Sequence, residues 1–443
     1  MTLSVSAHQL FNAKNLLGSI TLCFFVTQPW DRHLADVYWL LLSLVSFIYL
    51  GLQKYQGHDN PATPKTLKTI LWLFVCMPVI SIISYLTSPL DTLPPEVLEP
   101  DARWLLIIAI ILAMRNARIG PKWILLFIAS YAISTFISAV METNYLRALG
   151  ARANGDENAV PYGMFNATIA LMLLVFFINP NLNKLFSQEP NKTPENNNRK
   201  NVIIRSLLFL LFTLSVIAAF LSGTRAAVLL LPVVMIGLYI IRYPIKKALI
   251  GLTIILGLGT VLITQSKSVL VYKLISTPTT VTSYFVNNDR ASKLKNQRLE
   301  QWKESACIFT LHPLLGTGPR SFKYAHQTYG SENYCNAVQF LKQGSDQAHS
   351  VYFNTLGTLG LAGIITTLLL SLALLRSGIN ASQQANPTSK LGGSLLITVL
   401  ACHAINGITL DLWFMNHMMD KNLLVLALPL LLIFHNRAPS KES

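Results

Sequence analysis

Apolar runs of about twenty residues limit most strongly what this chain of 443 residues can fold into. Hydrophobic residues make up 52% of the sequence and charged residues only 12%. A soluble domain carries roughly 25% charged residues, about twice as many. Most of the runs also lack the polar face that a helix of a soluble protein needs. Because about 20 apolar residues cross the core of a bilayer, the sequence predicts an all-α, polytopic integral membrane protein.

The runs predict about twelve transmembrane helices. Their expected bounds are Leu10–Gln28, Ala35–Leu52, Thr66–Leu86, Arg103–Met114, Pro121–Met141, Val160–Ile178, Val202–Leu221, Ala226–Ile241, Lys247–Thr264, Ser350–Leu375, Leu391–Thr409 and Asn422–His435. The fourth run is short and could begin as early as Val97. We therefore expect transmembrane helices one to nine in residues 1–264, a periplasmic loop domain in residues 265–349, and helices ten to twelve with a short cytoplasmic tail in residues 350–443.

The segments between these runs divide by charge. If the N-terminus lies inside, the inner segments hold most of the lysines and arginines, among them Lys65, Arg118 and Lys247. The outer segments hold few, and one of them carries Asp91 and Glu96. This is the positive-inside pattern, and an even number of spans places both termini in the cytoplasm. The net charge of +15 is thus explained by membrane orientation, without nucleic acid as a partner. No removable signal peptide is expected, since the N-terminus lacks a basic segment followed by a cleavage site.

The long polar loop, Gln265–Ala348, is expected to contain structure of its own. Arg290–Phe309 has the periodicity of a helix. Its expected apolar side consists of Leu294, Leu299, Trp302, Ala306 and Phe309, and its charged residues are Lys295, Arg298, Lys303 and Glu304. His312-Pro313 should end this helix, because the residue before a proline avoids the helical conformation. Gly316–Pro319 should then form a turn.

The five cysteines fall into two groups. Cys23, Cys76 and Cys402 lie in apolar runs and are expected to be packing residues. Cys307 and Cys335 both lie in the polar loop. A disulfide between them is plausible if the loop faces an oxidising compartment, and two free thiols are the equal alternative.

Arginines at the outer side of the membrane are candidate phosphate ligands, because a guanidinium binds phosphate oxygens in a bidentate manner. The candidates are Arg225, Arg298, Arg147, Arg152 and Arg320. Arg225 lies in SGTRAA, a short reversal between two apolar runs, which would hold its guanidinium at the mouth between two helices. Each of these arginines has a simpler alternative role, as an anchor at the membrane interface or as a solvated loop charge.

His349 is the candidate general base. It precedes a membrane helix on the outer side, where the positive end of the helix dipole disfavours an imidazolium ion. The ring is therefore expected to stay neutral near pH 7 and to accept a proton. The alternative is a histidine that serves only in packing.

The sequence lacks the motifs of several other kinds of site. It contains no Asp-x-Asp, His-Glu-x-x-His or Cys-x-x-Cys pattern, so no metal is indicated, and no Gly-x-Ser-x-Gly or P-loop. Few acids lie inside the spans, whereas ion-coupled transporters usually need them. Arginines can neutralise a diphosphate leaving group while a neutral histidine deprotonates a hydroxyl. This combination favours glycosyl transfer from a lipid diphosphate over transport without chemistry.

Four motifs resemble the O-antigen ligase family, within the wider group of O-antigen ligases, O-antigen polymerases and bacterial protein O-oligosaccharyltransferases. They are SGTRAA at 222–227, RLEQW at 298–302, HPLLGTGPRSF at 312–322 and AHSVYFNTLGTLGLAG at 348–363. The resemblance implies a GT-C-like membrane glycosyltransferase without a cofactor. It also implies an inverting transfer of O-antigen from undecaprenyl diphosphate to the lipid A–core oligosaccharide, at the periplasmic face of the bacterial inner membrane.

The resemblance also assigns roles to residues. Arg225 and Arg298 match functional arginines of the family, and His349 matches its essential histidine. Arg320 stands where many relatives have a small residue, so no role is transferred to it. Arg147 and Arg152 lie in a loop that cannot be aligned securely, and one of them could be a further phosphate ligand. A polymerase, an O-oligosaccharyltransferase and a polytopic transporter remain as alternatives.

Overall fold

The structure is a computed structural model. It describes residues 7–56, 63–91, 93–146, 159–182, 185, 194–242, 282, 285–286, 297–330, 335, 347–412 and 416–435. Its elements are α1 (Ala7–Thr27), α2 (Arg32–Tyr55), α3 (Lys65–Leu86), the 3-10 helix η1 (Pro95–Asp101), α4 (Ala102–Asn116), α5 (Pro121–Leu146), α6 (Ala159–Ile178), α8 (Pro194–Leu221), α9 (Arg225–Arg242), α13 (Gln297–Leu311), α14 (Phe322–Tyr329), α15 (Val351–Ser382), α16 (Pro387–Thr409) and α17 (Asn416–Ile433). No strand occurs in these residues, which agrees with the predicted all-α class.

The helices confirm an integral membrane protein of the polytopic kind. Among the described residues, 7 helices are long and apolar enough to cross a membrane, and two shorter apolar helices lie at Ala13–Thr27 and Arg225–Leu238. Every predicted span within the described residues coincides with a helix, including the short one at α4. The ninth predicted span, Lys247–Thr264, lies outside the described residues. The total of twelve spans therefore stays a prediction.

The centre of the bundle is a helix without a polar face. Every residue of α17 from Met418 to Phe434 is buried, and α6 is buried along nearly its whole length. A helix that is apolar all round is stable only when other helices surround it. The outer helices differ in this respect. On α2, Trp39 and Leu42 are buried while Leu40 is 59% exposed, as expected where one face meets lipid.

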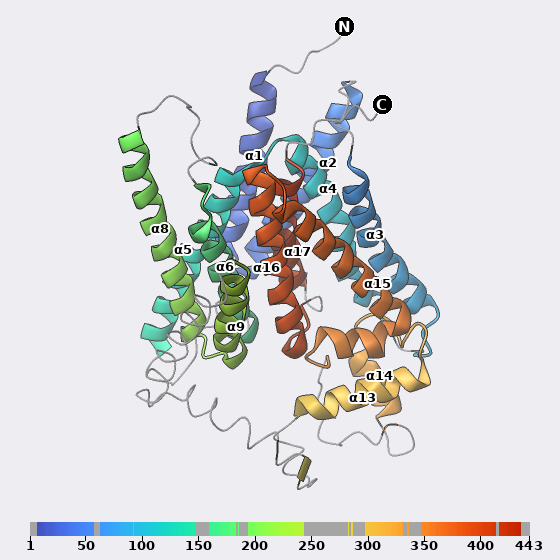
Figure 1. Cartoon of the computed structure of the whole chain (residues 1–443). Helices are drawn as coiled ribbons and strands as arrows, with labels where there is room; N and C mark the ends of the chain where they lie inside the picture. The colour runs from blue at the N-terminus through green and yellow to red at the C-terminus, as the bar shows by residue number, and fades with distance from the viewer. Residues whose placement is uncertain are drawn as a thin grey trace.

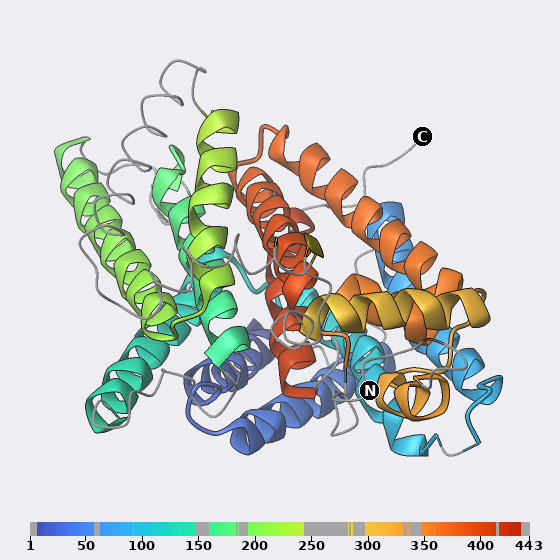
Figure 2. The same ribbon diagram turned by 90° about the horizontal axis from the view of Figure 1, so that it is seen from below.

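The two ends of the bundle carry different parts of the chain. Figure 1 shows the start of α1 and the end of α17 at the upper end, and α13 and α14 at the lower end beside the start of α15. At the upper end, the hydroxyl of Ser389 at the start of α16 donates to the carbonyl of Ile433 at the end of α17 (3.4 Å). Figure 2, seen from below, shows α13 lying across the lower face of the molecule.

A break at Gly360 divides α15 into two arms, residues 351–359 and 361–382. Gly360 has φ 59° and ψ −153°. At the break, two hydrogen bonds within the helix are replaced by hydrogen bonds between α15 and the turn at 313–318. The carbonyls of Gly357 and Thr358 accept from the N–H groups of Thr317 and Gly318, at 3.3 and 2.9 Å. On the other side of the break, two N–H groups of α15 donate to carbonyls of the same turn: Leu361 to Pro313 at 2.9 Å and Ala362 to Leu314 at 3.1 Å.

This break lies within the expected tenth span. The tenth span was expected to begin at Ser350, but the first arm of α15 packs on α13, where the Phe353 ring stacks on the Trp302 indole with centroids 5.0 Å apart. The first arm therefore belongs to the same layer as the loop helices. The Gly-rich turn predicted at Gly316–Pro319 is confirmed, with φ +66° at Gly316 and +109° at Gly318. It is this turn that docks into the break.

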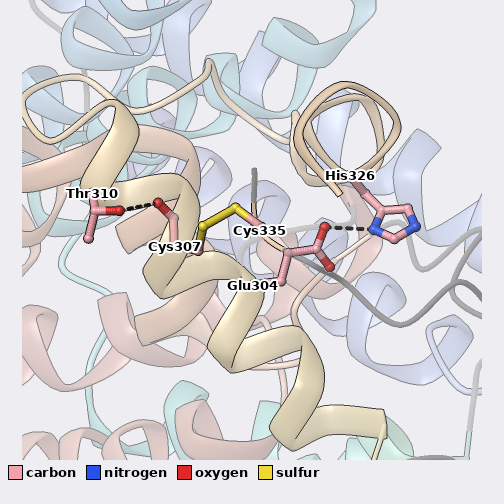
Figure 3. The surroundings of a disulfide bond; sticks show 5 residues. All are labelled: Glu304, Cys307, Thr310, His326 and Cys335. Atoms are coloured by element: carbon pink, nitrogen blue, oxygen red, sulfur yellow. Dashed lines mark hydrogen bonds and ion pairs between the residues drawn. A yellow bond between two sulfur atoms is a disulfide. The ribbon is translucent and has the colours of Figure 1, made fainter. Parts of the chain in front are cut away.

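A disulfide and a hydrogen bond between side chains join α13 to the segment that follows it (Figure 3). Cys307 and Cys335 are bonded, with their Cα atoms 5.7 Å apart, so the plausible pairing is confirmed. Nδ1 of His326 on α14 lies 2.6 Å from a carboxylate oxygen of Glu304. These two links hold α13 and the segment after it as one unit.

The predicted loop helix ends where expected, but the prediction of its buried face was wrong. α13 ends at Leu311, immediately before His312-Pro313, while residues 290–296 lie outside the described part. The residues that α13 buries are Glu300, Gln301, Glu304, Ser305 and Ile308, not the expected apolar side. The reason is the surface on which α13 packs. Gly357 of α15 has no side chain, so Ser305 of α13 packs against the α15 backbone and not only against apolar side chains. From the expected apolar side, Trp302 does pack inward on Phe353.

Candidate active site

The turn between α8 and α9 sets the position of Arg225. Gly223 adopts φ +61°, and the hydroxyl of Ser222 donates to the carbonyl of Ala219 at 2.6 Å. The hydroxyl of Thr224 donates to the carbonyl of Ala159, the first residue of α6, at 2.7 Å. Ser222 and Thr224 are buried. The short reversal predicted from SGTR is therefore present, and it fixes Arg225 as the first residue of α9.

His349 is held from both sides in an unusual backbone conformation. Its φ is +51°, a left-handed value that costs a non-glycine residue about 1–2 kcal/mol. The Trp302 indole donates to the carbonyl of Ala348 at 3.1 Å, and the hydroxyl of Ser350 donates to the carbonyl of Gly407 at 3.0 Å. Strained residues of this kind concentrate at functional sites, where the surroundings hold them in place.

Arg298 lies on the helix that supports His349. It precedes Trp302 by four residues, so the two side chains share one face of α13 about 6 Å apart along the helix axis. Since Trp302 is bonded to Ala348, the residue before His349, Arg298 lies one helical turn from the segment that carries the histidine.

Arg298 and Arg225 lie close enough for their charges to interact. Burial and the charge of Arg225 together lower the pKa of Arg298 below its usual range. These residues come from different helices, α13 and α9, and their positive charges oppose each other. Gathering like charges in a partly buried place is unfavourable unless an anion is bound there. Diphosphate is an anion of the required charge and geometry.

A buried amide ties His349 to the end of α16. The side chain of Asn354 accepts from the N–H group of Ala348 at 3.3 Å and donates to a carboxylate oxygen of Asp411 at 2.6 Å. Asn354 and Asp411 are both buried. The sequence did not indicate these positioning residues, although Asn354 stands in the motif AHSVYFNTLGTLGLAG and Asp411 in an outer turn.

Of the other three predicted arginines, the structure describes only Arg320, and it binds elsewhere. Arg320 donates to a carboxylate oxygen of Asp101 and to the carbonyl of Val97, both at 2.8 Å. Its side chain therefore joins the Gly-rich turn to η1. Arg147 and Arg152 lie outside the described residues. The segment that contains them leads into Ala159, which contacts the turn before Arg225.

Buried acids lie at the ends of the helices on this side of the molecule. Asp420 is fully buried and forms an ion pair with Arg103 at 2.6 Å. Lys421 is also buried, with its ammonium 5.0 Å from the Phe165 ring centroid. Asp420 and Lys421 come directly before the twelfth predicted span, so they do not conflict with the expectation that acids are rare inside the spans. Arg103 partners Asp420 at the start of α4.

Comparison with protein families identifies part of the chain. The family model described as O-Antigen ligase matches residues 209–368. This segment of the chain is therefore similar to the O-antigen ligase family. None of the curated proteins that were compared matches the chain. The matched segment begins in α8 and ends in α15, so Arg225, Arg298 and His349 all fall within the O-antigen ligase region.

Proposed function

We propose that this protein transfers O-antigen polysaccharide from undecaprenyl diphosphate to a sugar hydroxyl of the lipid A–core oligosaccharide. The reaction takes place at the periplasmic face of the bacterial inner membrane. The observation that supports the proposal is that Arg225 of α9 and Arg298 of α13 come from separate helices yet interact: burial, and after it the charge of Arg225, lowers the pKa of Arg298. The helix of Arg298 also holds the segment of His349 through the hydrogen bond from Trp302 to Ala348.

The chemistry assigns one task to each group. The imidazole of His349 takes the proton of the acceptor hydroxyl as its oxygen forms a bond to the anomeric carbon of the donor. The bond between that carbon and the diphosphate oxygen breaks, and Arg225 and Arg298 neutralise the charge that grows on undecaprenyl diphosphate. A single displacement inverts the anomeric centre. Because arginines supply the positive charge, the transfer is expected to need no metal.

Two features support the proposed side of the membrane. The disulfide between Cys307 and Cys335 is of a kind that persists in oxidising compartments such as the periplasm. The candidate site also lies at the end of the bundle opposite the start of α1 and the end of α17 (Figure 1). Cytoplasmic termini and a periplasmic site follow if the charge pattern orients the chain.

The direct test is transfer by purified protein from a defined undecaprenyl-diphosphate glycan to lipid A–core in vitro. We expect ligated product from the native protein and none from His349→Ala, because this change removes the proposed general base. His33→Ala is a matched control, since His33 is an exposed histidine at the start of α2, and it should keep full activity. Native activity in His349→Ala would refute the proposed mechanism.

The same assay separates the alternatives within the superfamily. A polymerase would lengthen the glycan on its lipid carrier and leave lipid A–core unmodified. A protein O-oligosaccharyltransferase would require a protein acceptor. A transporter would form no new bond under any of these conditions.

A further inference from the structure

A cavity of about 430 Å³ lies between the two arms of α15 and α16. The first arm contributes Val351 and Tyr352, and the second arm contributes residues between Thr367 and Leu375. The break at Gly360 separates the arms, so both ends of one bent helix line the same space. The remaining wall comes from α16, α3, α4, α17 and Leu412.

The chemistry of the lining suits an apolar guest. Most lining residues are aliphatic. The polar ones are Tyr352, Thr367, Ser371 and His403, and two of the hydroxyl groups are already bonded to helix carbonyls. Tyr352 donates to Ala404 at 2.7 Å and Thr367 donates to Gly363 at 2.9 Å. A cavity with few free polar groups holds water poorly and accepts apolar ligands.

The cavity has an exposed rim and a buried floor. Leu368 and Leu372 at the rim are 55% and 59% exposed, on the side of α15 where lipid would lie. Trp104, Leu374 and Leu426 at the floor are buried. A hydrocarbon chain could therefore enter sideways from the membrane without passing through water.

The cavity also reaches the candidate active site. Val351 and Tyr352 follow His349 by two and three residues. Val351 and Leu412 further belong to the same buried apolar cluster as Ala227 and Leu230 in the first turns of α9, next to Arg225. A chain in the cavity would thus end near the proposed position of the diphosphate.

We propose that this cavity binds the first isoprene units of the polyisoprenyl chain of the donor. The inference rests on the proposed function and adds to it a site for the lipid part of the substrate. The volume decides between the two lipid substrates. At about 430 Å³ the cavity lies toward the small end of ligand pockets, which are roughly 300–1,000 Å³. It accepts a segment of one chain, as the donor has, and not the several acyl chains of lipid A.

Donors of different chain length provide the test. Transfer of the same glycan is measured from an undecaprenyl diphosphate donor and from a short diphosphate donor that carries a methyl group in place of the polyisoprenyl chain. In Ala401→Phe, whose new ring fills the cavity from α16, kcat/KM for the long donor should fall about ten-fold or more relative to the short donor. The burial of only two methylene groups contributes a factor of about ten.

Controls keep the outcome clear. Leu369→Phe adds a ring on the same arm of α15, but at an exposed residue that does not line the cavity, and it should leave the ratio between the donors unchanged. Thr367→Phe fills the cavity from α15 and serves as a second variant if Ala401→Phe does not fold.

A donor with a photoreactive group in its first isoprene units gives an independent readout. Its label should appear in residues 367–375 or 397–404. Equal loss of activity with both donors, or labelling of these residues by a photoreactive acyl chain of the acceptor instead, would overturn the inference while leaving the proposed function intact. Absence of transfer from every donor would instead count against the proposed function.

Discussion

At the scale of single residues, a lysine substitution can distinguish the charge of an arginine from the geometry of its guanidinium group. Lysine keeps the positive charge of Arg225 but loses the planar fork that binds two phosphate oxygens. We expect Arg225→Lys to lower kcat/KM for the lipid diphosphate donor on the order of 10–100-fold, the effect of losing one strong charge-assisted hydrogen bond. The assay is in vitro transfer at several donor concentrations. Arg32→Lys, an exposed arginine at the start of α2, is the control, and equal activity in both variants would argue against bidentate binding.

Asn354 is expected to matter through His349 and not through the substrate. Asn354→Ala leaves the N–H group of Ala348 and a carboxylate oxygen of Asp411 without this partner. An unsatisfied buried group costs roughly 1–3 kcal/mol. We therefore predict a lower thermal unfolding temperature in detergent together with a lower kcat and a nearly unchanged donor KM. Activity like that of the native protein would show that the amide does not position the histidine.

The residue scale also shows what the sequence could predict. SGTRAA and the histidine before a helix single out Arg225 and His349 at membrane boundaries, while Arg298 in RLEQW is singled out by the resemblance to the O-antigen ligase family. Asn354 and Asp411 were not indicated, since a buried amide is recognised only by the partners that folding brings to it. For Arg320, the sequence shows the charge but not Asp101, the residue that binds it.

At the scale of elements, the disulfide should stabilise the loop more than the bundle. Cys307 and Cys335 are separated by 28 residues, and removing a cross-link of this kind typically costs about 2–4 kcal/mol. In a variant with both changed to serine, we expect faster proteolysis within residues 297–346 and a higher donor KM, because Arg298 lies on the tethered helix. Cys76→Ser, which removes a free thiol, is the control. Unchanged proteolysis and KM would show that the hydrogen bond between Glu304 and His326 is sufficient to hold the loop.

The elements illustrate a second limit of the sequence. Apolar length predicted the spans well, since a membrane helix must have that length. The predicted buried face of α13 was wrong because the periodicity argument assumes that a helix packs against apolar side chains. Instead, α13 buries Glu300 and Glu304, and Glu304 bonds to His326. The bend of α15 was missed for a related reason: the run from Ser350 to Leu375 is continuous in hydropathy, and only the docked turn reveals the break at Gly360.

At the scale of the whole molecule, the orientation can be tested with single cysteines. The background would lack Cys23, Cys76 and Cys402 and keep the disulfide. Lys303→Cys on α13 and Lys390→Cys on α16 both introduce an exposed thiol, at opposite ends of the bundle. A membrane-impermeant maleimide that reaches only the periplasm should label the first and not the second. The reverse labelling would place the candidate site in the cytoplasm and exclude a lipid-linked glycan donor on the proposed side.

The break in α15 has a consequence for how the molecule assembles. In an unbroken helix, the N–H groups of residues 361 and 362 would bond to the carbonyls of residues 357 and 358. Here the same four groups bond to residues 313–318 instead, so a straight α15 and a docked turn are mutually exclusive. The straight helix and the docked turn use the same hydrogen-bond donors and acceptors. Docking of the turn onto α15 is therefore an all-or-none event. His349, at the tip of the first arm, acquires its position in that event.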